Sequence, residues 1–411
     1  MDAIKYRGNN LYLENALVEK IAKKNTTPFY LYSLKKLENN FNFFHQTFSQ
    51  TNPLICFAVK SNPNLTILKN LKNLGAGADV VSIGELQLAL KAGMASKKIV
   101  FSGVGKTSEE LTYAISKKIL LINAESENEV GEIIKIAKKT KKKVTIGLRI
   151  NPNINANTIK KISTGKKSDK FGIDLEKCFD ILKRNKKNKN ISIDALSVHI
   201  GSQIKEVAPF QKTLNLIDKF INRLNDQGIK INYLDLGGGM GIPYSASEKS
   251  FDLKKYAKIV HRFNQKHQFK IIFETGRYMA ANTALLVAKV TYIKKIQDRN
   301  FIILDAAMND LMRPALYGAK HEILPLRKTS KKFNRKIEFV GPICESTDKF
   351  ITYANYPKIK EGDYVCFTNA GAYGRSLSSN YNVRPFVAEI AVNKKTYRII
   401  RPRQKLKDLI K

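Results

Sequence analysis

The sequence predicts a (β/α)8 TIM barrel followed by a second, mostly β-sheet domain, which is an α/β plus β fold. Three observations lead to this prediction. Short apolar runs recur between residues 54 and 275, and amphipathic stretches separate most of them. After Arg277 the pattern changes to strand-like runs with Gly, Pro and Asn turns. A chain of 411 residues is too long for one ordinary hydrophobic core, so we expect two domains.

Eight apolar runs have the length and composition of buried strands. They are Ile55–Val59, Ala78–Val81, Ile99–Phe101, Leu120–Ile122, Val144–Ile150, Ala195–Ile200, Tyr233–Leu236 and Ile271–Phe273. Helical spacing of apolar residues is found between them at Glu85–Ala92, Glu109–Ile115, Glu129–Ala137 and Leu175–Leu182. This alternation predicts parallel strands with helical crossovers, either in a barrel or, as the alternative from the pattern alone, in a doubly wound sheet.

The residues that follow these runs favour the barrel. Nearly every run ends in a chemically capable or flexible group: Lys60, Ser82, Ser102-Gly103, Asn123, Arg149–Asn151, His199–Ser202, Gly237–Gly239 and Glu274–Arg277. In a TIM barrel the active site lies at the carboxyl ends of the strands. We therefore expect these groups to converge on one rim.

The remaining runs predict a β-rich second domain. They are Leu285–Tyr292, Phe301–Leu304, Lys336–Val340, Tyr364–Thr368 and Val387–Val392, and Leu11–Leu13 near the start of the chain has the same alternation. We expect the barrel over residues 26–280. Residues 1–25 and 281–411 are expected to form the second domain.

The charge of the chain is extreme, because 72 Lys and Arg against 35 Asp and Glu give a net charge of +37. Such a charge suits a nucleic-acid partner. However, the excess is spread along the whole chain, and Lys, Asn and Ile, which are all abundant, share AT-rich codons. Genome composition is the simpler explanation, so no nucleic-acid partner is expected.

The expected cellular location of the protein, and the expectation that it has no metal site, rest on features that the sequence lacks. No apolar stretch could span a bilayer, and the first residues lack the apolar segment of a signal peptide. The four cysteines have no CxxC spacing, so neither a disulfide framework nor a metal site is indicated. We expect a cytoplasmic protein without a membrane partner.

Lys60 follows the first apolar run, within the segment Leu54–Asn64 (LICFAVKSNPN), at the point where polar turn residues begin. An ammonium is costly to bury at a strand end, and its pKa falls when it is desolvated. A neutral amine in a pocket attacks carbonyl groups, which is the starting condition for Schiff-base chemistry. The alternative is a lysine that simply reaches solvent, and the local sequence alone favours that alternative.

Two other strand ends suggest binding chemistry. Three successive glycines, Gly237–Gly239, let backbone N–H groups approach an anion closely, and phosphate is favoured over a flexible turn. Glu274 and Arg277 could bind a protonated ring nitrogen and an anion, although a mutual ion pair is favoured when they are considered alone. A lone His199 is usually structural, and Cys344 alone is more often an inert apolar residue.

Six motifs taken together resemble the barrel-fold (fold type III) pyridoxal-phosphate-dependent decarboxylases. They are Phe57–Asn62, His199–Gln203, Gly237–Gly239, Glu274–Arg277, Cys344–Asp348 and Gly371–Gly374. Met308–Tyr317 resembles the substrate segment of the diaminopimelate decarboxylases within that family. The resemblance runs in order from about residue 28 to residue 390. It implies the two-domain architecture of alanine racemase.

The resemblance implies a cofactor, pyridoxal 5'-phosphate, and residues that bind it. Lys60 would anchor the cofactor covalently, His199 would stack on its ring, and Glu274 would keep the ring nitrogen protonated. The phosphate would be bound by Ser202, Gly238, Gly239 and Tyr373. Asp79, Gly276 and Arg277 complete the implied cofactor-binding set.

The resemblance also implies a shared active site in a homodimer. Cys344, as proton donor, and Glu345, as a contact for the substrate amine, would enter from the partner subunit. Together with Lys60 and His199, Cys344 forms the implied catalytic set. The substrate would be bound by Arg277, Arg313, Tyr317, Glu345 and Tyr373.

The implied reaction is the decarboxylation of meso-2,6-diaminopimelate to L-lysine and CO2, the last step of lysine biosynthesis. A related decarboxylase acting on carboxynorspermidine or arginine remains the alternative. A non-catalytic cofactor-binding regulator would be expected to lack Lys60 or Cys344. Thr275, Val383 and Phe386 depart from the usual pattern of the family, which puts polar contacts at the last two positions in doubt.

Overall fold

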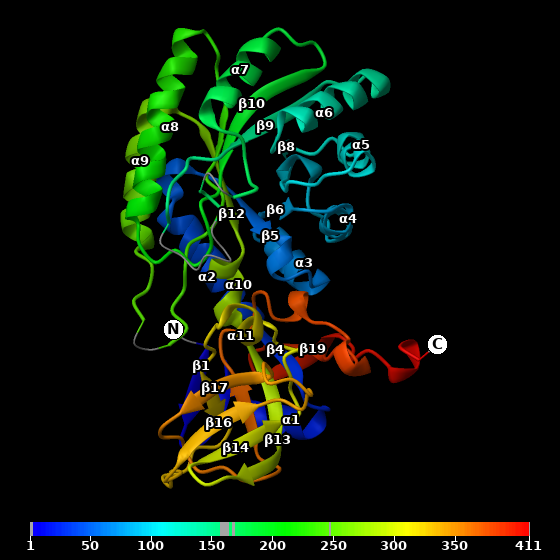
Figure 1. The fold of residues 1–411 in the computed structure, drawn as a ribbon, viewed down its shortest axis with the longest axis vertical. Coiled ribbons are helices and arrows are strands. Elements are labelled where there is room, and N and C mark those ends of the chain that lie inside the picture. Colours follow the sequence, from blue (N-terminus) through cyan, green and yellow to red (C-terminus); the bar gives the residue numbers. More distant parts are fainter. Residues whose placement is uncertain (1–2, 157–163, 167–168, 246–247, 411) are drawn as a thin grey trace. The chain divides into compact units, whose positions relative to one another are not determined.

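The computed structural model describes residues 3–156, 164–166, 169–245 and 248–410. The chain divides into two compact units (Figure 1). The sheet unit comprises Met1–Asn40, Pro243–Glu248 and Met279–Lys411. The barrel unit comprises Phe41–Ile242 and Lys249–Tyr278.

The barrel unit is built on eight parallel strands that close on themselves in the order β10-β11-β12-β5-β6-β7-β8-β9. Their bounds are β5 Leu54–Ala58, β6 Gly77–Val80, β7 Ile99–Phe101, β8 Leu121–Ala124, β9 Val144–Ile150, β10 Ile191–Val198, β11 Tyr233–Asp235 and β12 Lys270–Thr275. Each predicted apolar run overlaps one of these strands. The barrel prediction is therefore confirmed, and the doubly wound sheet is wrong because β9 pairs with β10 and β12 with β5.

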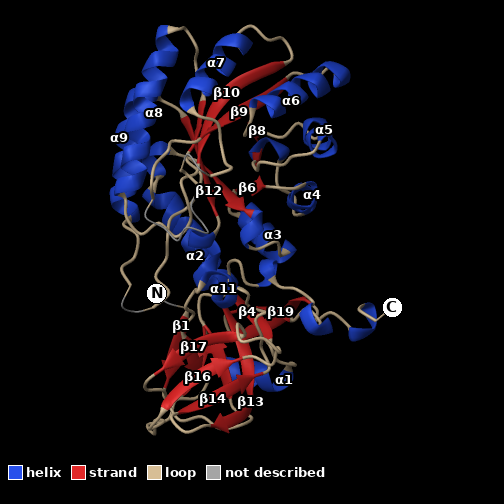
Figure 2. Ribbon diagram, in the orientation of Figure 1, coloured by secondary structure: helices blue, strands red, loops and turns tan. Residues whose placement is uncertain are grey.

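Helices follow most of the barrel strands and surround them (Figure 2). They are α3 Leu65–Asn73, α4 Ile83–Lys91, α5 Ser108–Ser116, α6 Glu127–Thr140, α7 Leu175–Asn185, α8 Ala208–Asp226 and α9 Leu253–His267; a further helix, α2 Leu34–Thr47, precedes β5. Many begin at a side chain that accepts a backbone N–H of the first turn, as Ser82 does for α4 and Ser126 for α6. Such caps satisfy donors that a helix start leaves free, which fixes where each helix begins after its strand.

The sheet unit holds the strands that pair mainly antiparallel. One sheet has the order β17-β16-β14-β13-β4-β19-β20, with β18 paired to β13 and β15 paired to β18. Its bounds are β4 Phe29–Ser33, β13 Ala284–Lys295, β14 Arg299–Leu304, β15 Ile323–Pro325, β16 Lys336–Val340, β17 Lys349–Tyr353, β18 Tyr364–Phe367, β19 Ala388–Asn393 and β20 Thr396–Arg401. A second sheet contains β1 Ile4–Arg7, β2 Asn10–Leu13 and β3 Ala16–Leu17. The short α-helices are α1 Val18–Lys24, α10 Arg277–Ala280 and α11 Arg313–Tyr317. The predicted β-rich domain is confirmed as a fold.

Strand β4 differs from the expectation for its part of the chain. Phe29–Ser33 falls in the segment expected to belong to the barrel, but it pairs with β13 and with β19 in the sheet unit. All five residues of the strand are buried, so the run has no polar face that would indicate which sheet it joins. Only the pairing decides its place.

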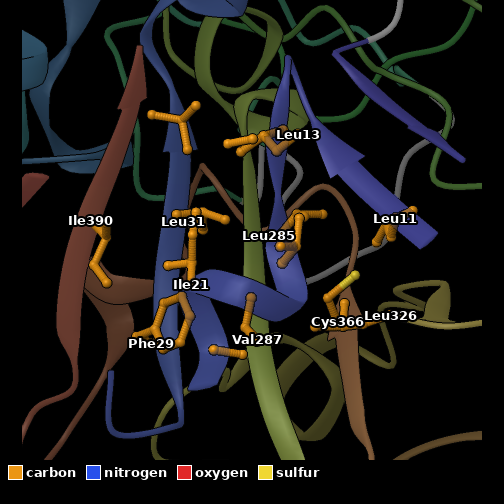
Figure 3. Packing of buried hydrophobic residues seen from close by; sticks show 14 of the residues in the cluster. Leu11, Leu13, Ile21, Phe29, Leu31, Leu285, Val287, Leu326, Cys366 and Ile390 are labelled. Carbon is orange, nitrogen blue, oxygen red and sulfur yellow. The ribbon is translucent and has the colours of Figure 1, made fainter. Parts of the chain in front are cut away.

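The core of the sheet unit lies between β4, β13 and β19 and the N-terminal elements (Figure 3). Leu31 and Leu285 are fully buried at its centre, and Ile21 of α1 and Leu11 of β2 pack on the same cluster. The elements β2 and α1 thus bury apolar side chains against β4 and against strands that follow Arg277. Among the described residues, no helix is both long and apolar enough to cross a bilayer.

We expect Leu285→Ala to lower the free energy of unfolding by about 2–5 kcal/mol, because it opens a cavity in this fully buried cluster. Urea denaturation followed by near-ultraviolet circular dichroism measures the change. Ile399→Ala on β20, where the side chain is largely exposed, is the control and should change stability by less than about 0.5 kcal/mol. Equal effects of the two substitutions would contradict this assignment of the core.

Candidate active site

A change from apolar to polar side chains occurs inside the barrel towards the carboxyl ends of its strands. Cys56, Val100, Leu121, Ala195 and Ile272 form one buried apolar cluster. Side chains alternate along a strand, so a residue two positions further on faces the same side. Those residues are Ala58, Ser102, Asn123, Ser197 and Glu274. A polar layer therefore lies directly above the apolar one, at the end where barrel active sites form.

Lys60 lies in a short 3-10 turn, Val59–Ser61, immediately after β5. Its Nζ is 3.3 Å from Oδ2 of Asp79 on β6. The lysine side chain is 40% exposed, whereas Asp79 is fully buried and its Oδ1 accepts no hydrogen bond from any described residue. Burial, with the nearby charge of Glu274, raises the pKa of Asp79 to about 6 although Lys60 lowers it. The carboxylate thus orients an amine that remains accessible.

His199 follows β10, and its orientation is fixed by the glycine loop. The backbone N–H of Gly238 donates to Nδ1 of His199 at 3.1 Å. Burial, and then the positive charges of Arg149 and Lys60, hold the pKa of His199 well below its usual value. The imidazole is therefore neutral, and the proton is on Nε2. A neutral ring of this kind can stack on a flat aromatic ligand.

The Gly237–Gly239 loop requires glycine for two different reasons. Gly237 and Gly239 have φ values of +62° and +95°, a region that side chains disfavour. A Cβ on Gly238 would lie 2.3 Å from the carbonyl oxygen of Glu274. Nearby, Arg277 donates from Nη2 to Oγ of Ser202 at 3.0 Å. Backbone N–H groups, a hydroxyl and a guanidinium are suitable partners for a phosphate.

Glu274 on β12 is buried and accepts a hydrogen bond at Oε1 from Oγ of Ser102, 2.8 Å away. Burial first, and then the negative charge of Asp235 with a hydrogen bond between the two side chains, raises the pKa of Glu274 to about 8. At neutral pH this carboxyl group carries a proton. It can donate that proton to a basic nitrogen.

Asp235 on β11 belongs to this network, but the sequence analysis gave it no role. Its carboxylate accepts hydrogen bonds from Nδ2 of Asn123 at 2.8 Å, from Oγ of Ser197 at 3.1 Å and from the N–H of Gly237 at 2.9 Å. The signal was present in the sequence, because Asp235 is the acidic residue of the run that leads into the three glycines. Its inward orientation could not be known before the strand register was known.

Two buried ion pairs support the loops above this layer. Nη1 of Arg149 lies 2.7 Å from Oε1 of Glu125, which also accepts the N–H of Gly103. Nζ of Lys106 lies 2.6 Å from Glu129 and donates to the carbonyl oxygens of Gly103 and Asn123. These cations bind the ends of neighbouring strands to one another. They hold Ser102 and Asn123 in place, and sequence reasoning found neither pair.

The residues of the barrel unit fit pyridoxal phosphate. The amine of Lys60 would meet the aldehyde group of the cofactor and the neutral imidazole of His199 its ring, while the protonated carboxyl of Glu274 would meet its ring nitrogen and the glycine loop its phosphate. Nine of the predicted cofactor-binding residues lie at the carboxyl ends of the barrel strands. They are Lys60, Asp79, His199, Ser202, Gly238, Gly239, Glu274, Gly276 and Arg277.

The other predicted site residues lie in the sheet unit. Arg313 is buried, donates from Nη1 to Nε2 of His321 at 2.8 Å, and covers the ring of Tyr244. Tyr317 ends α11, and Tyr373 has a φ of +56°. Cys344 and Glu345 are both exposed. As site residues, these five and the nine of the barrel unit are predictions.

The three departures from the family pattern also have defined surroundings. Thr275 is buried at the end of β12, next to Gly276, whose added Cβ would lie 3.0 Å from Ser61. Val383 is 53% exposed. The guanidinium carbon of Arg375 lies 3.9 Å from the centroid of the Phe386 ring. Phe386 therefore makes a stacking contact instead of an ionic one.

We expect Gly238→Ala to raise the Kd for pyridoxal phosphate roughly tenfold or more, because the added Cβ would collide with backbone and push the loop outward. An absorbance titration of cofactor-free protein measures the Kd. Gly131→Ala in α6 is the control, since nothing lies within 4 Å of its added Cβ, and its Kd should be unchanged. An unaltered Kd in Gly238→Ala would contradict the assignment of this loop to the phosphate.

Comparison with known proteins agrees with this arrangement. Residues 34–281 match the family "Pyridoxal-dependent decarboxylase, pyridoxal binding domain". The chain is 39% identical to diaminopimelate decarboxylase of Haemophilus influenzae over 409 residues, which cover 100% of this chain and 98% of that one. It is 40% identical to the enzyme of Vibrio cholerae over 412 residues, with the same two coverages.

Solved structures of two relatives have the same fold throughout. Diaminopimelate decarboxylase from Helicobacter pylori, complexed with L-lysine, superposes with a TM-score of 0.91 at 39% identity and covers 95% of this chain and 98% of its own. The enzyme from M. jannaschii, in co-complex with L-lysine, superposes with a TM-score of 0.95 at 33% identity over 100% and 97% of the two chains. This chain therefore belongs to the diaminopimelate decarboxylase family of pyridoxal-dependent decarboxylases.

Proposed function

We propose that this protein decarboxylates meso-2,6-diaminopimelate to L-lysine and CO2, the last step of lysine biosynthesis. The observation that carries the proposal is the convergence of Lys60, His199, Glu274 and the glycine loop on one rim of the barrel. Full-length similarity to diaminopimelate decarboxylases, two of them solved with L-lysine, supports the substrate.

Pyridoxal phosphate, when bound, supplies the electron sink that accepts the electron pair left by the departing carboxylate. The chain's own residues bind and orient it. Lys60 would hold its carbonyl carbon, and Asp79 would keep the amine directed at that position. The neutral ring of His199 would cover one face of the site and exclude water there. The carboxyl group of Glu274 would keep a proton at the ring nitrogen.

The substrate has an amino-acid group at each end, so the enzyme needs a second recognition site for the end that does not react. Arg277 and Arg313 suit its carboxylate, and Glu345 suits its ammonium group. Tyr317 and Tyr373 complete the proposed set. Arg313 is suited to this role because His321 and Tyr244 already fix its guanidinium, so little side-chain freedom is lost on binding.

We assign the protonation of the carbanion to Cys344, acting from the partner subunit of a homodimer. Its exposure within one chain is consistent with a residue that completes a neighbour's site. The adjacent Glu345 is already oriented, because the hydroxyl of Tyr381 donates to Oε1 and Oγ1 of Thr347 donates to Oε2. We propose that the β-rich domain, residues 1–25 and 281–411, supplies both the substrate contacts and the dimer interface.

We place the enzyme in the cytoplasm, with no nucleic-acid or membrane partner. Its four cysteines are free thiols, which is usual in a reducing compartment. A small biosynthetic substrate needs no such partner. The excess of lysine then reflects the composition of the genome.

We expect the purified protein, supplied with pyridoxal phosphate, to release L-lysine from meso-diaminopimelate. A coupled assay that detects lysine measures this release. The control panel contains carboxynorspermidine and arginine. Their decarboxylation should be slower by about 10³-fold or more, because neither has a carboxylate at the end that does not react, where the buried Arg313 would bind one. A preference for either compound would show that meso-diaminopimelate is not the substrate, while the proposed role of the cofactor would still hold.

A mixture of two inactive variants tests the shared site. We expect Lys60→Ala to abolish activity and Cys344→Ala to lower kcat by about 10²–10⁴-fold, while Cys344→Ala still binds the cofactor. When the two are unfolded and refolded together, heterodimers gain one intact site, which restores roughly a quarter of wild-type activity. Refolding each variant alone is the control. If the mixture stays inactive while both variants form dimers, Cys344 does not act across the interface.

A further inference from the structure

We propose that Asp235 is a positioning residue that keeps the proton of the Glu274 carboxyl group in place until pyridoxal phosphate binds, when that proton passes to the cofactor's ring nitrogen. This role rests on the proposed function, because it requires Glu274 to meet a pyridine nitrogen. It also deepens that function, since it says where the proton on the nitrogen comes from.

The hydrogen bonds of Asp235 identify it as the anionic member of the pair. Oδ1 accepts from the N–H of Gly237, and Oδ2 accepts from Nδ2 of Asn123 and Oγ of Ser197. The residue is fully buried. Burial raises the pKa of Asp235, but its hydrogen bonds oppose this shift, because donors aimed at a carboxylate stabilise its charged form.

The position of Glu274 then requires the proton to be on Glu274. It is buried on the strand next to Asp235 and in the same layer of side chains, and two neighbouring carboxyl groups without access to water do not both carry a negative charge. Its Oε1 accepts the hydroxyl of Ser102, which itself accepts a hydrogen bond from Asn123. One amide therefore supports both acids, on β11 and on β12.

The other ionisable groups around the pair oppose each other. Lys60, after β5, lowers the pKa of Glu274, whereas Asp79 on β6 and Glu274 each disfavour a second negative charge nearby. The positive charge of Arg149 on β9 lowers the pKa of Asp79 and, together with that of Lys60, the pKa of His199 after β10. The thiol of Cys56 on β5 stays protonated, because burial and the surrounding acids raise its pKa. Burial and Asp235 outweigh Lys60 at Glu274.

The proposed transfer is balanced within the site. When the cofactor enters with its ring nitrogen unprotonated, the O–H bond of the Glu274 carboxyl group would break and an N–H bond would form at that nitrogen, so no proton would be needed from water. Asp235 remains an anion throughout. The hydroxyl of Ser102 stays in place to donate to the new carboxylate.

Carboxyl 13C NMR of the cofactor-free full-length protein tests the pairing directly. The Glu274 signal is identified by its loss in Glu274→Gln, and it should titrate at about pH 8 in the wild type. We expect Asp235→Asn to lower this midpoint by on the order of one pH unit or more, because the negative neighbour is gone. An unchanged midpoint would overturn the proposal.

Two further serine variants keep the test decisive if Asp235→Asn does not fold. Ser197→Ala keeps every charge but removes one donor to Asp235, which makes that carboxylate a stronger base and should raise the midpoint of the coupled pair. Ser192→Ala, at the opposite end of the same strand β10, is the matched control and should leave it unchanged. Equal midpoints in these two variants would also refute the pairing.

Proton uptake on binding tests the transfer itself. Calorimetry of pyridoxal phosphate binding at pH 7, in two buffers of different ionisation enthalpy, counts the protons taken from solution. Asp235→Asn should take up roughly half a proton or more above the wild type, since its Glu274 is no longer fully protonated beforehand. An equal count in both proteins would refute the transfer. If neither protein binds the cofactor, the proposed function fails, whereas the NMR titration still decides the pairing.

Discussion

Three carboxyl groups, Asp79, Asp235 and Glu274, are buried in one polar layer at the end of a closed barrel, and the rest of the site depends on how they are kept there. Their side chains are buried, so solvation by water does not stabilise their charges and each group needs another stabilising interaction. A nearby lysine amine compensates Asp79, three hydrogen-bond donors compensate Asp235, and a retained proton neutralises Glu274. These three interactions also orient the amine of Lys60, fix the glycine loop and provide an acid for a ring nitrogen.

The loops above the layer are held by charges that take no direct part in the chemistry. The ammonium group of Lys106 donates to the carbonyl oxygens of Gly103 and Asn123, which belong to the ends of two neighbouring strands. Arg149 and Glu125 form a second buried pair. A buried pair adds little net stability compared with a well-packed apolar contact, but breaking one leaves an uncompensated charge. Its value here is that it fixes the positions of the polar side chains below it.

In the sheet unit, hydrogen bonds and packing hold the proposed substrate-binding side chains in place. Arg313 is buried beside Tyr244 and His321. The imidazole of His321 is itself fixed, because its Nδ1 donates a hydrogen bond to the carbonyl oxygen of Thr368. A guanidinium held in this way recognises a carboxylate with little loss of conformational freedom. Glu345 is oriented by Tyr381 and Thr347 at the surface, which suits the proposed contribution to a neighbouring subunit.

The sequence alone determined most of the fold and much of the barrel site. Apolar runs of strand length, with helical spacing between them, predicted the eight barrel strands, because burial on both faces leaves a continuous apolar signature. Motifs at the strand ends indicated Lys60, His199 and Glu274. The tertiary structure alone decided that Phe29–Ser33 belongs to the sheet unit, since a strand buried on every side gives no sign of its partners. It alone revealed Asp235, whose role depends on which side of β11 faces inward, and that is set by strand pairing across the closed barrel.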